Sequence, residues 1–124
     1  MPQNRLTGQI GEQRATDYLI RHNFTIRETN VFSKWGELDI IAEKNNKIHF
    51  VEVKTRISVR QGMPYEAVRI PKLLHLQRAI QFYIQRNKLQ KYKFQLDVIS
   101  IQLDHGHNVI DLRYYENVEV NNWY

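Results

Sequence analysis

The sequence predicts a single α/β domain in which a mixed β-sheet is flanked by helices, with its elements in the order αβββαββ. The length of 124 residues leaves room for one domain, residues 1–124, and a content of 42% hydrophobic and 25% charged residues is typical of a globular protein. Two segments repeat apolar residues with the period of a helix, and five shorter ones are rich in β-branched and aromatic residues.

The first helix is expected from about Asn4 to His22, with Asn4 as its N-cap. Its stripe of small and apolar residues comprises Gly8, Gly11, Ala15 and Leu19. The two glycines cost helix stability, which is reasonable if they let the helix approach the sheet closely. Three strands are expected next, over Thr25–Phe32, Leu38–Ala42 and Ile48–Val53. Asn45 and Asn46 tolerate positive φ and therefore predict a tight hairpin turn between the second and third strands.

A second helix and two more strands complete the predicted fold. Pro71 is suited to the first turn of a helix, since its fixed φ matches and its missing N–H costs nothing there. The apolar stripe of this helix comprises Leu73, Leu76, Ile80, Tyr83 and Ile84. The last two strands are expected over Phe94–Ile101 and Val109–Tyr115, on either side of a turn at His105 and Gly106.

The composition excludes several classes of protein. The chain has no cysteine, which excludes disulfides, thiolate catalysis and cysteine zinc sites. Its first twenty residues include charged side chains such as Arg5 and Glu12, so no apolar signal peptide is expected. No apolar run approaches the roughly 18–20 residues that span a bilayer. We therefore expect a soluble protein of the cytoplasm without a membrane partner.

The charge is polarised along the chain. The net charge is +5, but residues 54–93 contain ten basic side chains and one acid, a net charge of +9. The rest of the chain contains eight basic and twelve acidic side chains, a net charge of −4. This distribution predicts an anionic partner such as nucleic acid on one surface and carboxylates gathered elsewhere.

The predicted hairpin brings charged residues together. A two-residue turn at Asn45 and Asn46 places Asp39 opposite Glu52 and Glu37 opposite Lys54, all on one face. Leu38 is expected on the opposite face, together with Ile40, Ala42, Val51 and Val53. Opposed carboxylates repel unless one is protonated or a cation lies between them. An oxygen-only ligand set favours Mg²⁺ or Mn²⁺, and a metal there suits phosphodiester hydrolysis.

Three neighbours of this pair have predicted roles. Lys54 is placed to orient a water molecule or to stabilise developing charge. Glu12 lies on the small-residue stripe of the first helix, which is expected to bring it toward the metal. For Glu37 we favour neutralisation of Lys54 over metal ligation.

Three segments also resemble a known family: Gly8-x-x-Gly11-Glu12-x-x-Ala15-x-x-Tyr18-Leu19, Gly36-Glu37-Leu38-Asp39-Ile40-Ile41 and Phe50-Val51-Glu52-Val53-Lys54-Thr55-Arg56. With these motifs nearly the whole chain resembles the YraN family of bacterial proteins. That family is similar to the Holliday-junction-resolvase-like branch of the restriction-endonuclease-like superfamily, whose hallmark is an Asp on one strand and Glu-x-Lys on the next.

The resemblance implies a restriction-endonuclease-like sheet and a role for each motif residue. It implies Asp39 and Glu52 as metal ligands, Lys54 as the catalytic lysine and Glu12 as an acid contributed by the first helix. The backbone carbonyl of Val53, between Glu52 and Lys54, is included in the predicted metal site. The residue before Asp39 is leucine rather than the proline common in the superfamily.

Other residues carry weaker predictions. Arg56, Arg60 and Lys72 are candidates for contact with nucleic acid, against the alternative of a solvated surface. Asp97 is expected to pair with a basic neighbour rather than a metal. Trp35 is expected to pack at the sheet edge, with stacking on a base as the alternative. The five histidines are not expected to form a ligand set.

The sequence thus predicts a nucleic-acid-binding protein, namely a Mg²⁺- or Mn²⁺-dependent endonuclease-like phosphodiesterase acting on DNA, with branched DNA among its candidate substrates. The main alternative is a catalytically inactive DNA-binding or adaptor module of the same fold, and a protein-interaction domain is a weaker one. Homodimerisation stays open, because symmetric junction cleavage needs two active sites and the sequence does not reveal a dimer interface.

Overall fold

The elements occur in the order that the sequence predicts. The computed structural model describes residues 5–57 and 70–118, with the backbone alone for 70–72. Its elements are α1 (Arg5–Arg21), β1 (Thr25–Ser33), β2 (Gly36–Lys44), β3 (Lys47–Ile57), α2 (Ile70–Arg86), β4 (Lys93–Leu103) and β5 (Val109–Tyr115). The α/β class and the αβββαββ order are confirmed. Neither helix within the described ranges is long and apolar enough to cross a membrane.

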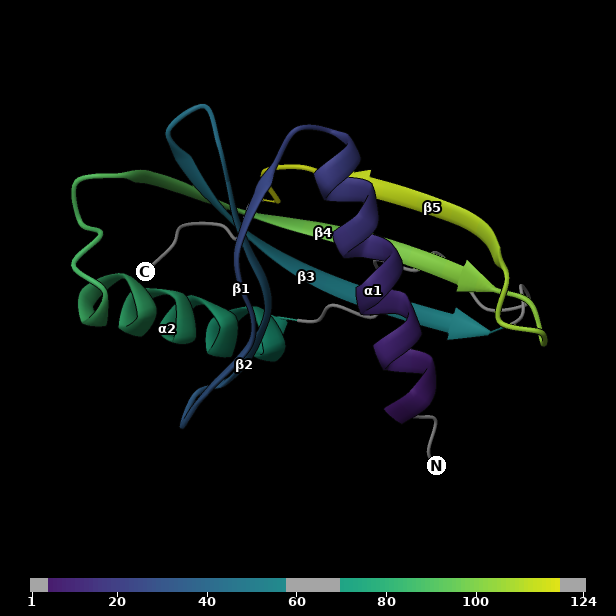
Figure 1. Cartoon of the computed structure of the whole chain (residues 1–124). Coiled ribbons are helices and arrows are strands. Elements are labelled where there is room, and N and C mark those ends of the chain that lie inside the picture. Colours follow the sequence, from purple (N-terminus) through teal and green to yellow (C-terminus); the bar gives the residue numbers. More distant parts are fainter. Residues whose placement is uncertain (1–4, 58–69, 119–124) are drawn as a thin grey trace.

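The five strands form one mixed sheet in the order β1-β2-β3-β4-β5. Neighbouring strands are antiparallel except β3 and β4, which run parallel and require a crossover connection. The crossover includes α2, and Figure 1 shows α1 and α2 against opposite faces of the sheet. The central strands are therefore covered on both sides, which explains their nearly continuous apolar runs.

Each helix covers its own hydrophobic cluster. On the α1 face, Ala15 and Leu19 belong to a cluster with the sheet residues Ile40, Ala42, Val51, Val53, Ile99, Ile101 and Leu103. On the α2 face, the helix residues Leu76, Ala79, Ile80, Tyr83 and Ile84 belong to a cluster with Leu38, Ile41, Ile48, Phe50 and Leu96. The stripes predicted for the two helices thus mark their buried faces, except that Thr7 rather than Gly8 is buried in the first turn of α1.

The β2–β3 hairpin has the predicted turn and register. Asn45 and Asn46 have φ values of 52° and 62°, the left-handed conformation that a tight hairpin turn requires. The paired residues run from Lys44↔Lys47 to Ile40↔Val51 in the predicted register, but the predicted pairs Asp39–Glu52 and Glu37–Lys54 are not part of the ladder. The ladder between β2 and β3 ends at that last pair, whereas β3 stays paired with β4 as far as Ile57. The hairpin therefore opens into a fork just beyond Ile40 and Val51.

One residue at the fork points differently from the sequence prediction. Strict alternation would place Leu38 on the same face as Ile40, which belongs to the α1 cluster. Leu38 instead belongs to the cluster under α2 and is only 3% exposed. The prediction for Leu38 was wrong because regular pairing with β3 ends before this residue, so the alternation across the ladder no longer holds there.

A glycine sets the contact between α1 and the sheet. A Cβ atom on Gly11 would lie 1.8 Å from Oγ1 of Thr55 and 2.9 Å from its Cβ, so only glycine fits at this crossing. The predicted close approach is confirmed for Gly11. It was wrong for Gly8, because a Cβ atom there meets no atom of the described residues within 4 Å.

Candidate metal centre at the fork of the β2–β3 hairpin

Asp39 lies where β2 separates from β3. Its Oδ2 accepts a hydrogen bond of 2.9 Å from the backbone N–H of Val53 on β3. Continued pairing in the same register would place Val53 opposite Leu38, so the carboxylate takes the N–H that the next ladder pair would use. Asp39 is therefore held between the two strands, and not on the flat face of a regular hairpin as the sequence predicts.

Two more carboxylates meet Asp39 at the fork. One carboxylate oxygen each from Glu12, Glu37 and Asp39 lie within 4.8 Å of one another. Glu37 and Asp39 come from β2, while Glu12 comes from α1 and directly follows Gly11 at the contact with the sheet. We call Glu12, Glu37 and Asp39 the acid cluster. Its formation depends on the close crossing of α1 over β3, because that crossing fixes the position of Glu12.

Glu52 adds a fourth carboxylate beside this cluster. It directly follows Val51, which is the last residue of β3 that pairs with β2. Only 3% of the Glu52 surface is exposed. Its charge acts on both Asp39 and Glu12, raising the pKa of each. The structure thus brings together three of the predicted site residues, Glu12, Asp39 and Glu52.

Burial and neighbouring carboxylates make ionisation of Asp39 and Glu12 unfavourable. Burial, and then the charge of Glu52, raise the pKa of Asp39 to about 8, although the Val53 N–H acts in the opposite direction. The pKa of Glu12 is also raised, first by burial and then by the charges of Glu37 and Glu52, against the lowering effect of a hydrogen bond from Asn30. Buried and half-buried carboxylates this close together are stabilised by a bound proton or by a cation among them.

The donor set fits a hard divalent cation. Carboxylate oxygens from Glu12, Glu37 and Asp39 converge from two different elements, and the buried Glu52 lies beside them. Mg²⁺ and Mn²⁺ prefer such oxygen ligands, whereas structural zinc sites are built mainly from cysteine and histidine. The residues present therefore fit the metal that the sequence predicts, with Val53 adjoining the site through its backbone.

Asn30 holds two of the carboxylates in place. Its Nδ2 donates hydrogen bonds to Glu12 at 2.8 Å and to Glu37 at 2.6 Å. The β1–β2 register places Asn30 between Thr29, paired with Ile40, and Val31, paired with Leu38. Sequence reasoning missed this asparagine, because its position across from Asp39 follows only from the register of β1 on β2.

The role predicted for Glu37 needs revision. The sequence favours neutralisation of Lys54 by Glu37, but the structure places the Glu37 carboxylate in the acid cluster with Asn30 as its donor. Glu37 is therefore a candidate ligand. The sequence signal for this was present, because Glu37 and Asp39 alternate with Leu38 along β2 and thus lie near one another.

The predicted basic residues fall into two groups. Lys54 and Arg56 lie half-buried on β3 beyond the fork, paired in register with Ser100 and Gln102 of β4. Arg60 lies outside the described residues. Lys72 is in the first turn of α2, at a position where only the backbone is described.

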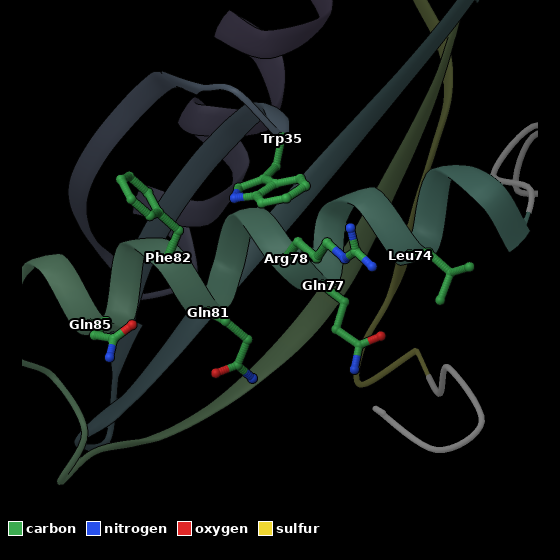
Figure 2. A pocket seen from close by; sticks show the side chains of 7 residues that line it. All are labelled: Trp35, Leu74, Gln77, Arg78, Gln81, Phe82 and Gln85. Carbon is green, nitrogen blue, oxygen red and sulfur yellow. The ribbon is translucent and has the colours of Figure 1, made fainter.

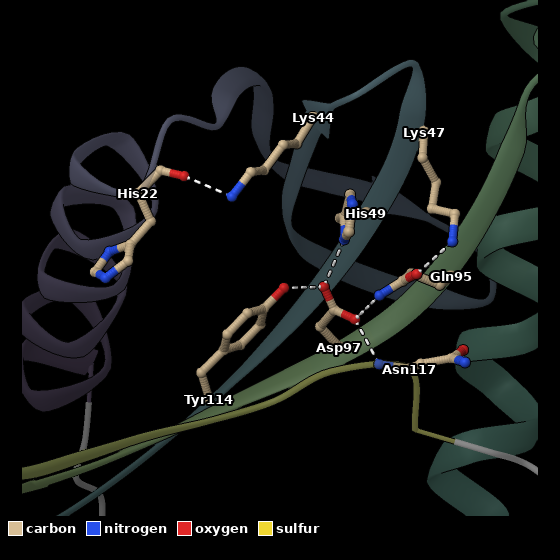
Figure 3. Close-up of polar contacts among 8 residues, drawn as sticks. All are labelled: His22, Lys44, Lys47, His49, Gln95, Asp97, Tyr114 and Asn117. Carbon is tan, nitrogen blue, oxygen red and sulfur yellow. Dashed lines mark hydrogen bonds and ion pairs between the residues drawn. The ribbon is translucent and has the colours of Figure 1, made fainter.

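A second buried aspartate lies elsewhere on the α1 face of the sheet. Figure 3 shows Asp97 of β4 bonded to Nδ1 of His49 at 2.7 Å, to the Tyr114 hydroxyl at 2.5 Å and to Nε2 of Gln95 at 2.7 Å. The backbone N–H of Asn117 is a further donor, at 2.8 Å. The expected basic partner of Asp97 is His49, which the parallel pairing of β3 with β4 brings alongside. The sequence gives no local signal for this partner.

Comparison with known proteins places the chain among relatives without an assigned function. The model of a family described as "Uncharacterised protein family UPF0102" matches residues 11–101, which include Glu12, Asp39, Glu52 and Lys54. A UPF0102 protein of Caldicellulosiruptor bescii is 42% identical over 103 residues, covering 82% of this chain and 87% of the relative. Another from Clostridium acetobutylicum is 40% identical over 114 residues, covering 92% and 93%. A third, from Fusobacterium nucleatum, is 38% identical over 110 residues, covering 84% and 92%.

Proposed function

The chain belongs to the uncharacterised protein family UPF0102, and we propose that it is a metal-dependent nuclease that hydrolyses phosphodiester bonds in DNA. One observation supports the proposal above the others. At the fork, Glu12, Glu37 and Asp39 converge within 4.8 Å, and the buried Glu52 raises the pKa of Asp39. A structural role alone would not favour such a concentration of like charge, whereas a divalent cation would stabilise it.

The residues of the fork divide the chemistry among them. Asp39 and Glu52 would hold a Mg²⁺ or Mn²⁺ ion, with Glu12, Glu37 and the Val53 carbonyl as further oxygen donors. The bound ion supplies Lewis-acid activation of a phosphate and lowers the pKa of a ligated water molecule. Lys54, two residues beyond Glu52 along β3, would orient the attacking water or stabilise charge that develops on the phosphate.

The surrounding charge suits a polyanionic substrate. Lys54 and Arg56 follow the acidic fork on the same strand and begin the segment of residues 54–93, whose net charge is +9. Lysine and arginine that neutralise phosphates provide most of the sequence-independent affinity of proteins for DNA. Acids that bind the metal and bases that bind the substrate would thus lie next to each other on β3.

A cleavage screen tests this proposal. Flap, junction, duplex and single-stranded DNA would each be incubated with the full chain, with and without Mn²⁺. We expect metal-dependent cleavage of at least one form of DNA. Asp39→Asn or Glu52→Gln should reduce it at least a hundredfold, because each replaces a charged metal ligand by a neutral side chain of similar size. Asp111→Asn on β5 is the matched control and should keep full activity, because Asp111 lies outside the fork and pairs with the exposed Arg113.

Two results would contradict the proposal. Cleavage that persists undiminished in both fork variants would place the reaction at another site. Salt-sensitive DNA binding without a metal-dependent product on any substrate would instead support the alternative of a DNA-binding module without turnover.

A further inference from the structure

An open pocket of about 630 Å³ lies over the outer face of α2. Figure 2 shows Trp35, from the turn between β1 and β2, lying above the helix, with Arg78 and Phe82 next to it and Leu74 farther along. The remaining lining is three glutamines spaced four residues apart, beginning at Gln77. Among the described residues, the lining therefore combines two aromatic rings, an arginine and a row of amides, without a carboxylate.

Trp35 is held in place on one side and accessible on the other. It is half-buried and packs partly against the hydrophobic cluster beneath α2. Its backbone N–H donates to Oγ of Ser33 at 3.1 Å, and the following Gly36 has a φ of 123°, which fixes the turn. The packing expected for Trp35 is thus present, but it leaves part of the indole ring at the pocket.

Two cations lie over the indole ring. The guanidinium carbon of Arg78 is 5.0 Å from the ring centroid, and Nζ of Lys34 is 5.1 Å from it. A cation over an exposed aromatic ring contributes only about a two- to fivefold preference, whereas a stacked base strengthens binding by roughly five- to a hundredfold. A base could therefore displace the exposed Lys34 from the ring and leave its ammonium group near the phosphate.

The charge of α2 is complementary to a nucleic-acid strand. Its sequence from Ile70 to Arg86 contains Lys72, Arg78 and Arg86 and no acidic residue. Phe82 is 39% exposed and Leu74 is 49% exposed, so apolar side chains face water beside these cations. Aromatic rings within a basic groove are the usual means of binding single strands, because every base offers a flat face for stacking.

We propose that this pocket binds unpaired nucleotides, which stack on Trp35 and Phe82 with their phosphates near Arg78 and Lys34. The inference rests on the proposed nuclease function. It adds that the DNA substrate contains a single-stranded portion. Trp35 and Glu37 are two residues apart, a distance of about 7 Å along an extended chain. A strand leaving the pocket would thus reach the fork within a short distance.

Binding of labelled oligonucleotides, measured by anisotropy without divalent metal, tests the inference independently of cleavage. We expect the wild-type chain to bind a single-stranded 12-mer, and Trp35→Leu to weaken that binding at least tenfold. Trp35→Phe should restore most of it, and affinity for a 12-mer duplex should change less than twofold. Tyr92→Leu is the matched control, because Tyr92 is also an exposed aromatic beneath a lysine, Lys91, but lies outside the pocket.

A second variant protects the test against misfolding. Phe82→Gln removes the other ring from a partly exposed position and should weaken single-strand binding severalfold while the chain still unfolds in one cooperative thermal transition. Unchanged single-strand affinity in both Trp35→Leu and Phe82→Gln would overturn the inference, as would failure of the wild type to bind single strands. If the chain then still cleaved duplex DNA with metal, the proposed nuclease function would hold although the pocket does not bind unpaired nucleotides. Loss of self-association in Trp35→Leu, with single-strand affinity unchanged, would also overturn the inference and assign the pocket to a second copy of the chain.

Discussion

Two buried aspartates on this sheet have opposite surroundings. Asp97 is fully buried and accepts hydrogen bonds from His49, Gln95, Tyr114 and the Asn117 backbone. Burial by itself would raise the pKa of Asp97, but these donors together lower it below the ordinary value. At Asp39, burial and then the charge of Glu52 raise the pKa, and the single bond from the Val53 N–H acts in the opposite direction without offsetting them.

The contrast separates a structural acid from a candidate functional one. Burial acts on both aspartates, so burial alone does not distinguish them. The two aspartates differ in their neighbours: hydrogen-bond donors surround Asp97, whereas other carboxylates surround Asp39. A buried carboxylate surrounded by other carboxylates is a candidate for binding a cation, whereas one surrounded by donors has its partners already.

The largest effect on stability is expected from a change that breaks the hydrogen-bond network around Asp97. Asp97→Asn puts an NH₂ group where an oxygen accepts bonds from several donors, so buried donors lose their partner. We expect a loss of about 3–5 kcal/mol in the free energy of unfolding, measured by urea denaturation. Asp111→Asn, whose carboxylate pairs with Arg113 on the surface, should change stability by less than about 0.5 kcal/mol.

The same variant should also change the response to acid. Because the pKa of Asp97 is lowered in the folded state, its contribution is present above its ordinary value of 3.8 and is lost as the pH falls through the folded pKa. Unfolding free energy measured from pH 6 downward should decline less steeply in Asp97→Asn than in the wild type. Parallel declines in the two proteins would show that Asp97 does not carry this acid sensitivity.

A smaller effect on stability is expected at Asp39, through the binding of metal. Mn²⁺ at about one hundred times its dissociation constant should stabilise the wild type by about 2.7 kcal/mol, because the ion binds the folded fork. Asp39→Asn should abolish most of that stabilisation. Without metal, at a pH above about 8 where Asp39 is charged, it should be at least as stable as the wild type, since it reduces repulsion among carboxylates. Thermal unfolding with and without Mn²⁺ provides the measurement, and an equal Mn²⁺ shift in both proteins would remove Asp39 from the ligand set.

The smallest expected effect tests the helix contact that positions Glu12. Gly11→Ala would force a Cβ atom against Thr55, so α1 must shift, at a cost of about 1–3 kcal/mol in unfolding free energy. Gly8→Ala is the matched control, because a Cβ atom there meets nothing within 4 Å in the described part of the chain. Alanine is the better helix former and should stabilise by about 0.5–1 kcal/mol. Chemical denaturation compares the two, and equal stability of both variants would contradict the close crossing.

The sequence predicts those parts of the site that depend on local rules. The register of β2 on β3 follows from the turn at Asn45 and Asn46, and Gly11 marks the helix crossing. Together these features explain why Asp39, Glu52 and Glu12 could be predicted as neighbours.

The parts that the sequence does not reveal depend on pairings between strands. Asn30 reaches the acid cluster through the register of β1 on β2, and His49 reaches Asp97 through the parallel pairing of β3 with β4. Leu38 and Glu37 were assigned wrongly or incompletely because the ladder ends at the fork. No local motif specifies where a ladder stops, since the end of pairing reflects packing of the whole layer.

The order of the strands has a consequence for how the site is assembled during folding. All four acids, Asn30 and Lys54 precede α2, and β1, β2 and β3 are neighbours both in sequence and in the sheet. Hairpins between consecutive strands close short loops, while the parallel pairing of β3 with β4 must wait for the crossover. Glu37, Asp39 and Glu52 are therefore brought together by consecutive strands, whereas Glu12 joins them when α1 packs across β3. A cation available at that moment would favour the folding of the first half.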